Sequence, residues 1–334
     1  MNERGTEALL LASRPVAALG VEHFTRAWVD PGAGALLLAP RYLSVDPYMR
    51  TRMQPQGYGY VSRWDAGSRL SAWTLAEVLA SDDPAWMPGQ WAVGHLPVQR
   101  EIRCDGDGLV ALPLGPAPLA WLHPLGMTGL TAWLGMREIG RVERRDRVLV
   151  GAAAGAVGSI AAQLARLEGA EVLVTAGRGD KRAWLEEIGF SHPLDHRAPG
   201  YAQALAAAVG EDGLTLNFEN LGGGAFEAAN RCMRRNGRVV LCGLISQYQQ
   251  PDPRRAPANL GSLSALGVRV LPFVAPEHYA LLPRFRAEMG ELLAQGALEW
   301  RLTVLEGGLE ALPRALLALF AGHNLGKCVV RLSG

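Results

Sequence analysis

The chain has 334 residues, with 33 Lys and Arg against 32 Asp and Glu and a formal net charge of +1. This balance argues against a broad electrostatic surface for nucleic acid or an anionic membrane, so neither is expected as a partner. With 49% hydrophobic and only 19% charged residues, the chain can bury a large core, and its length favours two domains over whole-chain disorder.

No apolar run approaches the ~20 residues that span a bilayer, and residues 1–14 mix charged residues with leucines rather than forming a secretory signal. The cysteines, Cys104, Cys232, Cys242 and Cys328, lie far apart and lack the close pairing of zinc sites or disulfide scaffolds. We therefore expect a cytoplasmic protein without a metal site.

The residues up to about His123 have the texture of a small β-rich, barrel-like domain. Short β-prone segments at 35–38, 91–93 and 109–112 are separated by proline and glycine. From Val148 the pattern changes to apolar strands that alternate with helices. It predicts strands at 148–150, 172–175, 214–218 and 239–242, and helices at 159–168, 181–188 and 225–233. This order is typical of the doubly wound parallel sheet of a Rossmann domain.

Beyond a strand at 270–274, the sequence again shows both helix and strand patterns. The pattern predicts a helix at 279–295, a strand at 302–305, a helix at 309–320 and a last strand at 328–332. The return to strands indicates that the C-terminal end rejoins the first domain. We therefore predict an α/β protein in which residues 1–122 and 293–334 form one domain and residues 123–292 the Rossmann domain.

A glycine-rich turn follows the predicted strand at 148–150. In Ala153-x-Gly155-x-x-Gly158, alanine occupies the position of the first glycine of the G-x-G-x-x-G fingerprint. Gly155 would let a pyrophosphate approach the backbone, and Gly158 would let helix and strand pack closely. Because the turn lies between a strand and a helix in a βα series, we predict a dinucleotide site rather than a plain structural turn.

The second predicted strand ends without the carboxylate that would hold the ribose hydroxyls of NAD. Arg178 and Lys181 instead supply positive charge where a 2′-phosphate would lie, which favours NADP(H). The alternative is two solvated charges at the start of a helix, but lysine occurs only at Lys181 and Lys327 in this arginine-rich chain. Asp180 is a competing feature, because it could turn toward a ribose hydroxyl.

Six segments occur in order: V-D-P-Y-M-R at 45–50, G-L-T-A-W at 129–133, A-A-A-G-A-V-G-S at 152–159, E-N-L-G-G at 219–223, L-C-G-L-I-S-Q-Y at 241–248 and N-L-G-K at 324–327. Together they resemble the zinc-independent medium-chain dehydrogenases/reductases of the prostaglandin reductase and alkenal double-bond reductase type. The resemblance covers about residues 41–331. It implies a GroES-like β-barrel catalytic domain, formed by both chain ends, that packs on a Rossmann domain, with NADPH in the cleft between them.

The resemblance also implies roles for individual residues. The turn residues Gly155, Ala156, Val157 and Gly158 would hold the pyrophosphate, and Lys181 the 2′-phosphate, with His196 where the family often has a tyrosine. The nicotinamide half would be lined by Asn220, Cys242, Gly243, Ser246, Tyr248, Phe273, Val274 and Asn324. Asn324 could also be a plain loop cap. Lys327 belongs to the same N-x-G-K segment, or is a surface charge before an edge strand.

Zinc-dependent relatives need Cys and His ligands in the first domain. The first 103 residues of this chain contain no cysteine, and His95 lacks the following glutamate of a ligand motif. Alcohol oxidation through zinc is therefore disfavoured, and the simpler chemistry is reduction of an enone or enal, with hydride transfer from NADPH to the β-carbon. The protein must then stabilise the enolate oxygen, and Tyr48 and Tyr248 are the hydroxyls best placed by motif to do so. Each could equally be a packed aromatic.

Two departures from the family pattern concern the substrate. Residues 71–74, S-A-W-T, replace a methionine-glycine-glutamine stretch, and Pro276 stands where some relatives have tyrosine. Either the substrate differs or activity has been lost. Apolar residues dominate near these motifs, so we expect a small hydrophobic electrophilic alkene.

Two alternatives to an enone reductase remain open at this point. One is a quinone reductase with the same cofactor, and the other is a catalytically silent NADPH-binding partner or sensor. In either case we expect a homodimer, because relatives join the edge strands of two Rossmann sheets and the apolar stretch 268–274 would otherwise leave an open edge.

Overall fold

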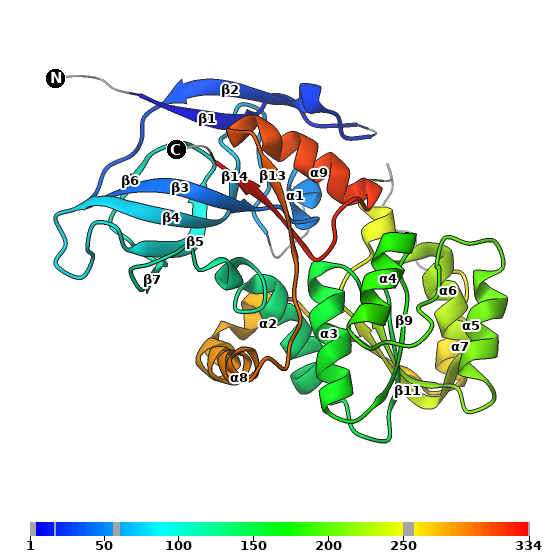
Figure 1. Cartoon of the computed structure of the whole chain (residues 1–334). Coiled ribbons are helices and arrows are strands. Elements are labelled where there is room, and N and C mark those ends of the chain that lie inside the picture. The colour runs from blue at the N-terminus through cyan, green and yellow to red at the C-terminus, as the bar shows by residue number, and fades with distance from the viewer. Residues whose placement is uncertain (1–4, 17, 56–60, 250–256, 333–334) are drawn as a thin grey trace. The chain divides into compact units, whose positions relative to one another are not determined.

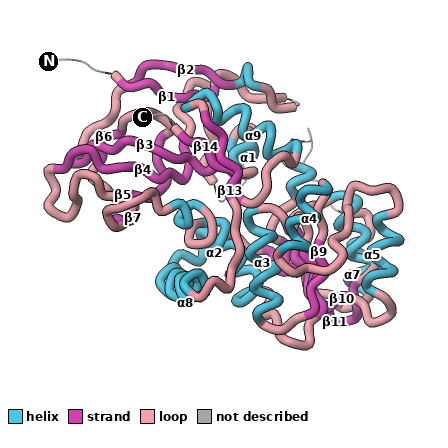
Figure 2. Tube along the Cα trace, viewed as in Figure 1, coloured by secondary structure: helices cyan, strands magenta, loops and turns pink. Residues whose placement is uncertain are grey.

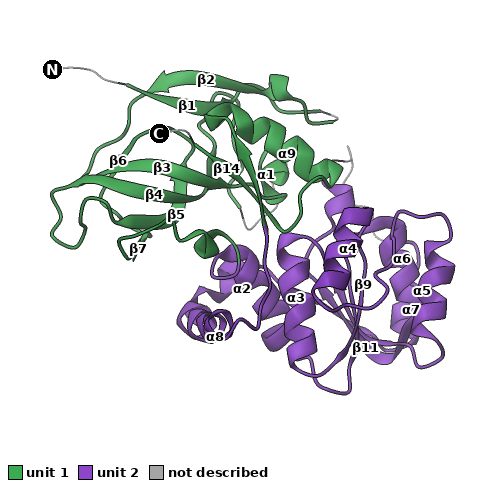
Figure 3. Ribbon diagram, in the orientation of Figure 1, with its two compact units in different colours: residues 1–123, 302–334 green, residues 124–301 purple. Residues whose placement is uncertain are grey.

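The computed structural model describes residues 5–16, 18–55, 61–249 and 257–332. The chain divides into two compact units, one formed by Met1–His123 with Leu302–Gly334 and the other by Pro124–Arg301 (Figure 3). The boundaries that we predict from the sequence fall at 122/123 and 292/293. The first four residues of the N-terminal stretch discussed above lie outside the described residues.

The second unit is built on a five-stranded parallel sheet with the order β12-β11-β10-β8-β9 (Figure 1). In chain order its strands are β8 (Arg147–Val150), β9 (Glu171–Val174), β10 (Leu214–Glu219), β11 (Met233–Leu241) and β12 (Arg269–Pro272). A parallel bridge between Thr175 and Leu194 adds a rudimentary strand beyond β9. With that bridge the order becomes 3-2-1-4-5-6, which is the Rossmann topology and confirms the predicted fold class.

Helices cover both faces of this sheet. Leu149 of β8 lies in a buried cluster with residues of α5 (Tyr201–Val209), α6 (Gly223–Arg231) and α7 (Leu260–Ala265). Because side chains alternate along a strand, Val148 and Val150 point to the opposite face. There α3 (Ala156–Leu167) packs against β8, β9 and α2 (Met127–Trp133). Burial on both faces explains the consecutive apolar residues at 148–150, 172–174 and 239–241.

The first unit is predominantly an antiparallel sheet with the order β13-β14-β3-β4-β5-β7, in which β6 also pairs with β3 and only β13 and β14 run parallel. The two chain ends meet in it, because β14 pairs with β3. Its strands are β3 (Leu36–Ser44), β4 (Ser71–Ser81), β5 (Trp91–Pro97), β6 (Ile102–Cys104), β7 (Val110–Leu112), β13 (Leu302–Glu306) and β14 (Lys327–Arg331). A separate hairpin joins β1 (Thr6–Leu11) to β2 (Phe24–Val29).

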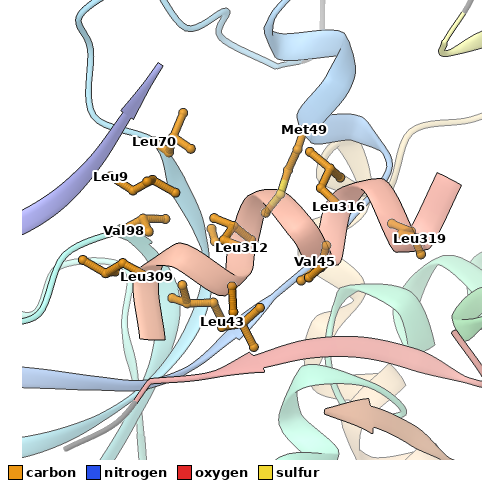
Figure 4. Close-up of a cluster of buried hydrophobic side chains, with 14 of the residues drawn as sticks. Leu9, Leu43, Val45, Met49, Leu70, Val98, Leu309, Leu312, Leu316 and Leu319 are labelled. Atoms are coloured by element: carbon orange, nitrogen blue, oxygen red, sulfur yellow. The ribbon is translucent and has the colours of Figure 1, made fainter. Parts of the chain in front are cut away.

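The core of the first unit gathers around α9 (Ala311–Ala321). Leu312, Leu316 and Leu319 of this helix lie in one cluster with Val45 and with Met49 of α1 (Tyr48–Arg52) (Figure 4). Burying each of these side chains contributes on the order of 1.5–3 kcal/mol. The cluster therefore holds the C-terminal helix against the segment that follows β3.

The structure contains elements that the sequence patterns do not predict (Figure 2). They include α2, which continues into the π-helical turn η3 (Leu134–Ile139), and the alanine-rich helix α5. The other helices of the second unit are α4 (Gly179–Glu187) and α8 (Leu282–Ala294), and short 3-10 turns lie at η1 (Val21–His23), η2 (Leu119–Leu122), η4 (Ile245–Gln247), η5 (Ala275–Leu281) and η6 (Gly308–Glu310). Among the described residues, no helix is both long and apolar enough to cross a membrane.

Candidate cofactor and catalytic site

The glycine-rich turn joins β8 to the first turn of α3. Gly155 is the N-cap residue of the helix, in an extended conformation, while Gly155, Ala156 and Val157 are partly exposed and Gly158 is buried. A Cβ on Gly158 would lie 2.5 Å from the carbonyl oxygen of Ala152, a backbone atom that cannot easily yield. The turn is therefore as tight as a dinucleotide fingerprint requires, and its exposed side presents the unpaired amides and positive dipole end of α3.

Charges cluster beyond β9, at the start of α4. The Arg178 guanidinium donates to both carboxylate oxygens of Asp180, at 3.0 and 3.2 Å. This pairing occupies the carboxylate that could otherwise compete for a ribose hydroxyl, and it also offsets the charge of Arg178. The side-chain ammonium of Lys181 makes no hydrogen bond or ion pair to another residue in the part of the chain that the structure describes.

Arg197 is a second cation at this position, and the motifs do not identify it. A Cβ on Gly177 would lie 2.6 Å from its Nε atom, so the guanidinium lies over the end of β9. Its side chain also has no ionic partner among the described residues, while the neighbouring Asp195 is paired with Arg182 at 2.7 Å. Burial, followed by the nearby charge of Arg197, lowers the pKa of Lys181 to about 8. Lys181 and Arg197 are thus two adjacent cations without a carboxylate partner among the described residues, and together they could hold an anion.

His196 lies beside the same cations. Its Nδ1 atom is 3.4 Å from the hydroxyl of Thr175. Burial and the charge of Arg197 lower the pKa of His196 to about 4, so the ring is neutral at pH 7. His196 can therefore contribute a hydrogen bond or a packing surface, but no charge, to a bound phosphate.

The loops after β10 and β11 are tied together. The carbonyl of Glu219 accepts from the amides of Cys242 and Gly243, and that of Asn220 accepts from Ile245. The Asn220 side chain in turn donates to the carbonyl of Gly151, 3.1 Å away, at the start of the glycine-rich turn. Three segments far apart in the sequence thus meet at the carboxyl edge of the sheet, which is where doubly wound folds bind ligands.

The side chains of these loops lie close to their glycines. The Tyr248 hydroxyl lies against Gly243, since an added Cβ there would be 3.3 Å from it. The Ser246 hydroxyl lies similarly beside Gly222, at 3.0 Å from an added Cβ. Burial and the Glu219 carboxylate raise the pKa of Cys242 to about 12, so this thiol is not a nucleophile at neutral pH.

Glu219 organises these loops and is a residue that the motif comparison assigns no role. Its carboxylate accepts hydrogen bonds from the amides of Leu221 and Gly222, both at 2.7 Å, and from the Asn217 side chain at 3.0 Å. Burial raises the pKa of Glu219, while these hydrogen bonds act in the opposite direction. The only sequence signal is a carboxylate at the end of an apolar strand.

Phe273 and Val274 follow β12. The Phe273 ring extends toward η3, because a Cβ on Gly135 would lie 3.2 Å from its Cζ atom. Val274 is the N-cap residue of η5, and Pro276 lies in the first turn of that element. The role of Phe273 and Val274 toward the nicotinamide stays a prediction.

In the first unit, Tyr48 begins α1 and is partly buried against the cluster around α9. The Asn324 amide donates to the carbonyl of Gly326 at 2.8 Å, so it does cap its own loop. Trp73 packs edge-on against His95, with ring centroids 6.2 Å apart, and His95 lies 3.3 Å from Nη1 of Arg52. The unusual tryptophan is therefore part of an aromatic and cationic group beside α1.

The alternative interpretation of Lys327 as a surface charge before an edge strand is wrong. Its side chain is 1% exposed, and β14 pairs with β13 on one side and with β3 on the other. The ammonium group forms an ion pair with Asp46, with Nζ 3.0 Å from Oδ1. This burial could not be read from the N-L-G-K segment, because it depends on strands from both ends of the chain.

Among the described residues, no group of three or more His, Cys, Asp or Glu residues could hold a metal ion. Burial and the charge of Arg52 lower the pKa of His95 to about 4.

Known proteins agree with this architecture. Residues 156–283 match the family described as zinc-binding dehydrogenase, and residues 7–112 match the N-terminal domain of oxidoreductase. The NADPH-dependent curcumin reductase of Escherichia coli (strain K12) is 34% identical over 335 residues, which are 97% of this chain and 96% of that protein. The 2-alkenal reductase (NADP(+)-dependent) of Nicotiana tabacum is 32% identical over 308 residues, 91% of this chain and 89% of that protein.

A solved structure extends the likeness to three dimensions. CurA from Vibrio vulnificus, in complex with NADPH, superposes with a TM-score of 0.91 at 32% identity, and the match covers 98% of this chain and 99% of that one. The chain is thus a medium-chain dehydrogenase/reductase. Within that superfamily it belongs to the zinc-independent, NADP-dependent branch of curcumin, alkenal and prostaglandin reductases.

Proposed function

We propose that this protein is an NADPH-dependent reductase of activated carbon–carbon double bonds, in α,β-unsaturated ketones or aldehydes. The observation that carries the proposal is the pair of cations without partners, Lys181 and Arg197, at the end of β9 in a Rossmann unit of this family. A carboxylate that holds the ribose of NAD is missing there, since Asp180 is paired with Arg178. The relatives reported above bear names that describe NADPH-dependent or NADP-dependent reduction of curcumin and alkenals.

The residues fit the cofactor in three places. The glycine-rich turn, closed to any larger side chain at Gly158, would hold the pyrophosphate at the first turn of α3. Lys181 and Arg197 would bind the 2′-phosphate, while Arg178 contributes less because Asp180 offsets its charge. The loop residues Asn220, Gly243, Ser246 and Tyr248 would line the nicotinamide half.

When bound, NADPH supplies a hydride for the β-carbon of the alkene. The protein must then orient the alkene and donate a hydrogen bond to the oxygen on which enolate charge develops. We assign this donation to the hydroxyl of Tyr248 or of Tyr48, because a phenol is a ready donor at neutral pH. Tyr248 is held by the bonded loops after β10 and β11, and Tyr48 by the buried start of α1.

The substrate that we propose is a small hydrophobic electrophilic alkene. Trp73, packed edge-on against His95, adds aromatic surface to β4 beside α1, in the stretch 71–74 where this sequence departs from the family pattern. Conjugated aromatic enones offer a planar apolar face to such a surface.

The test is a substrate panel that follows NADPH absorbance at saturating cofactor, with aromatic enones, short enals and quinones compared by kcat/KM. We expect enones to exceed quinones by at least an order of magnitude. Faster turnover of quinones would identify a quinone reductase instead. Tight NADPH binding without turnover of any electrophile would identify a silent binding protein.

We also propose a cytoplasmic homodimer. All four cysteines are free thiols, which suits a reducing compartment. Within the described residues, β12 pairs with β11 alone and leaves Val270 exposed at the edge of the parallel sheet, which a second copy could extend.

A further inference from the structure

The buried ammonium of Lys327 has a complete set of partners. It donates to the carbonyl of Val45 at 2.6 Å, to Oδ1 of Asp46 at 3.0 Å and to its own neighbour's carbonyl, Cys328, at 3.0 Å. An ammonium group has three donors, so all three are used. We call the Lys327 ammonium and its three acceptors the Lys327 node. This node fixes the short link between the end of β3 and the start of α1.

Asp46 carries this constraint to Tyr48. Its second carboxylate oxygen accepts a hydrogen bond from the hydroxyl of Ser44, the last residue of β3. Its carbonyl accepts the amide of Met49, at 3.1 Å, in the first turn of α1. The side-chain carboxylate and the backbone carbonyl of Asp46 thus both accept hydrogen bonds. Tyr48 lies in the turn that the bond to the Asp46 carbonyl closes.

The other side of the node is the turn that carries Asn324. Lys327 follows this turn directly, and the turn is itself fixed, because Leu325 exchanges two hydrogen bonds with the hydroxyl of Thr303 at 2.8 and 2.9 Å. A displacement of Lys327 would therefore move the Asn324 loop and the start of α1 relative to each other.

We propose that Lys327 and Asp46 are positioning residues for the reduction, and that their buried ion pair holds the hydroxyl of Tyr48 in place to donate to the substrate oxygen. This inference rests on the proposed function and on Tyr48 as a donor. The apolar side of α1 is already held by Met49 and Val45 in the cluster around α9 (Figure 4). The ion pair supplies the second, polar constraint, and two constraints fix the rotation of a helix that is five residues long.

The test uses a double variant, Lys327→Met with Asp46→Asn, because removal of one partner alone would leave an uncompensated buried charge. In the otherwise native protein we expect kcat to fall about tenfold, with the dissociation constant of NADPH changed less than about threefold. In a Tyr48→Phe background the same double variant should lower kcat less than about twofold, since the hydroxyl that it would displace is absent.

A matched control uses an exposed ion pair between β14, the strand that carries Lys327, and its neighbour β13: Nη1 of Arg331 lies 3.6 Å from Oε1 of Glu306. The double variant Arg331→Met with Glu306→Gln should leave kcat unchanged. A second readout does not need activity: hydrogen exchange of the amides of Met49 and Arg50 should accelerate in the Lys327→Met, Asp46→Asn protein, while exchange in the parallel sheet stays the same.

The outcomes distinguish failure of the positioning role from failure of the proposed function. Equal losses of kcat in the native and Tyr48→Phe backgrounds would overturn the positioning role and leave the reductase intact. A silent Tyr48→Phe variant would overturn it as well, and would leave Tyr248 as the tyrosine to be tested as the donor. Absence of enone turnover in the native protein would reject the proposed function itself, and unchanged exchange at Met49 and Arg50 would then reject the node independently.

Discussion

The cations beyond β9 predict a cofactor preference that depends on pH. The pKa of Lys181 is lowered to about 8 in the free protein, and a bound 2′-phosphate would raise it. NADPH therefore binds most tightly below pH 8, where the ammonium is charged, and loses affinity as the pH rises through this range. With a pKa of about 8, the charged fraction falls roughly tenfold between pH 7 and pH 9, and the affinity for NADPH should fall by about the same factor.

Substitutions of the three cations should weaken NADPH binding by different factors. A charge-assisted contact contributes on the order of 1.5–3 kcal/mol, which is roughly a 10- to 150-fold change in Kd. Lys181→Ala and Arg197→Ala should each weaken NADPH by at least about tenfold, whereas Arg178→Ala should have less effect because Asp180 already offsets that guanidinium.

The measurement is a fluorescence titration of NADPH and of NADH at pH 7 and pH 9, with the native protein and Lys181→Ala. NADH lacks the 2′-phosphate and serves as the control, so its Kd should change little with pH. The pH dependence for NADPH should disappear in Lys181→Ala. An equal pH dependence for both cofactors, or its persistence in the variant, would refute the assignment of the phosphate site.

Three further predictions concern the turn, the donor and the assembly. Gly158→Val should abolish NADPH binding in a protein that still folds, because even a Cβ would lie 2.5 Å from a backbone oxygen, and retained binding by titration would show that the turn is only structural. Tyr248→Phe and Tyr48→Phe are compared by steady-state kinetics. The variant that lacks the oxyanion donor should lose roughly 10² in kcat with little change in NADPH affinity. Two silent variants would leave backbone amides or water as donors. Light scattering should give a dimer at micromolar concentration, and a monomer of 35.8 kDa would contradict pairing through β12.

The parts of the fold that the sequence predicts are those with local periodicity. Strands β8, β9 and β10 contain short apolar runs between helices, and each lies within one residue of its predicted place at both ends, whereas β11 begins six residues before the predicted strand, in the polar stretch 234–238. The glycine-rich turn is recognisable for the same reason, since strand, turn and helix are adjacent in the chain. Helix α2 begins beside a proline and passes into a π-helical turn, so its pattern follows neither ordinary period.

The site residues that the sequence misses depend on contacts between distant segments. Arg197 reaches the end of β9 because a single bridge joins Thr175 to Leu194, and a bridge of one residue pair leaves no strand pattern. The pairing of Arg178 with Asp180 is local, yet two neighbouring charges in a sequence do not say whether they bind each other or a ligand. The structure shows that Arg178 binds Asp180, and we therefore propose that Arg197 rather than Arg178 contacts the phosphate.

The two lysines of this arginine-rich chain are retained for different physical reasons. At Lys327, the three acceptors converge on one atom, Nζ, within 2.6–3.0 Å, and a compact ammonium satisfies them where a planar guanidinium could not. At Lys181, a pKa of about 8 leaves the ammonium mostly charged at pH 7, and the loss of its proton above pH 8 lowers the repulsion with Arg197. An arginine at position 181 would stay charged at all relevant pH values, so its repulsion with Arg197 would persist. In this arginine-rich chain, Lys327 is thus distinguished by the compact shape of its ammonium group and Lys181 by its titration.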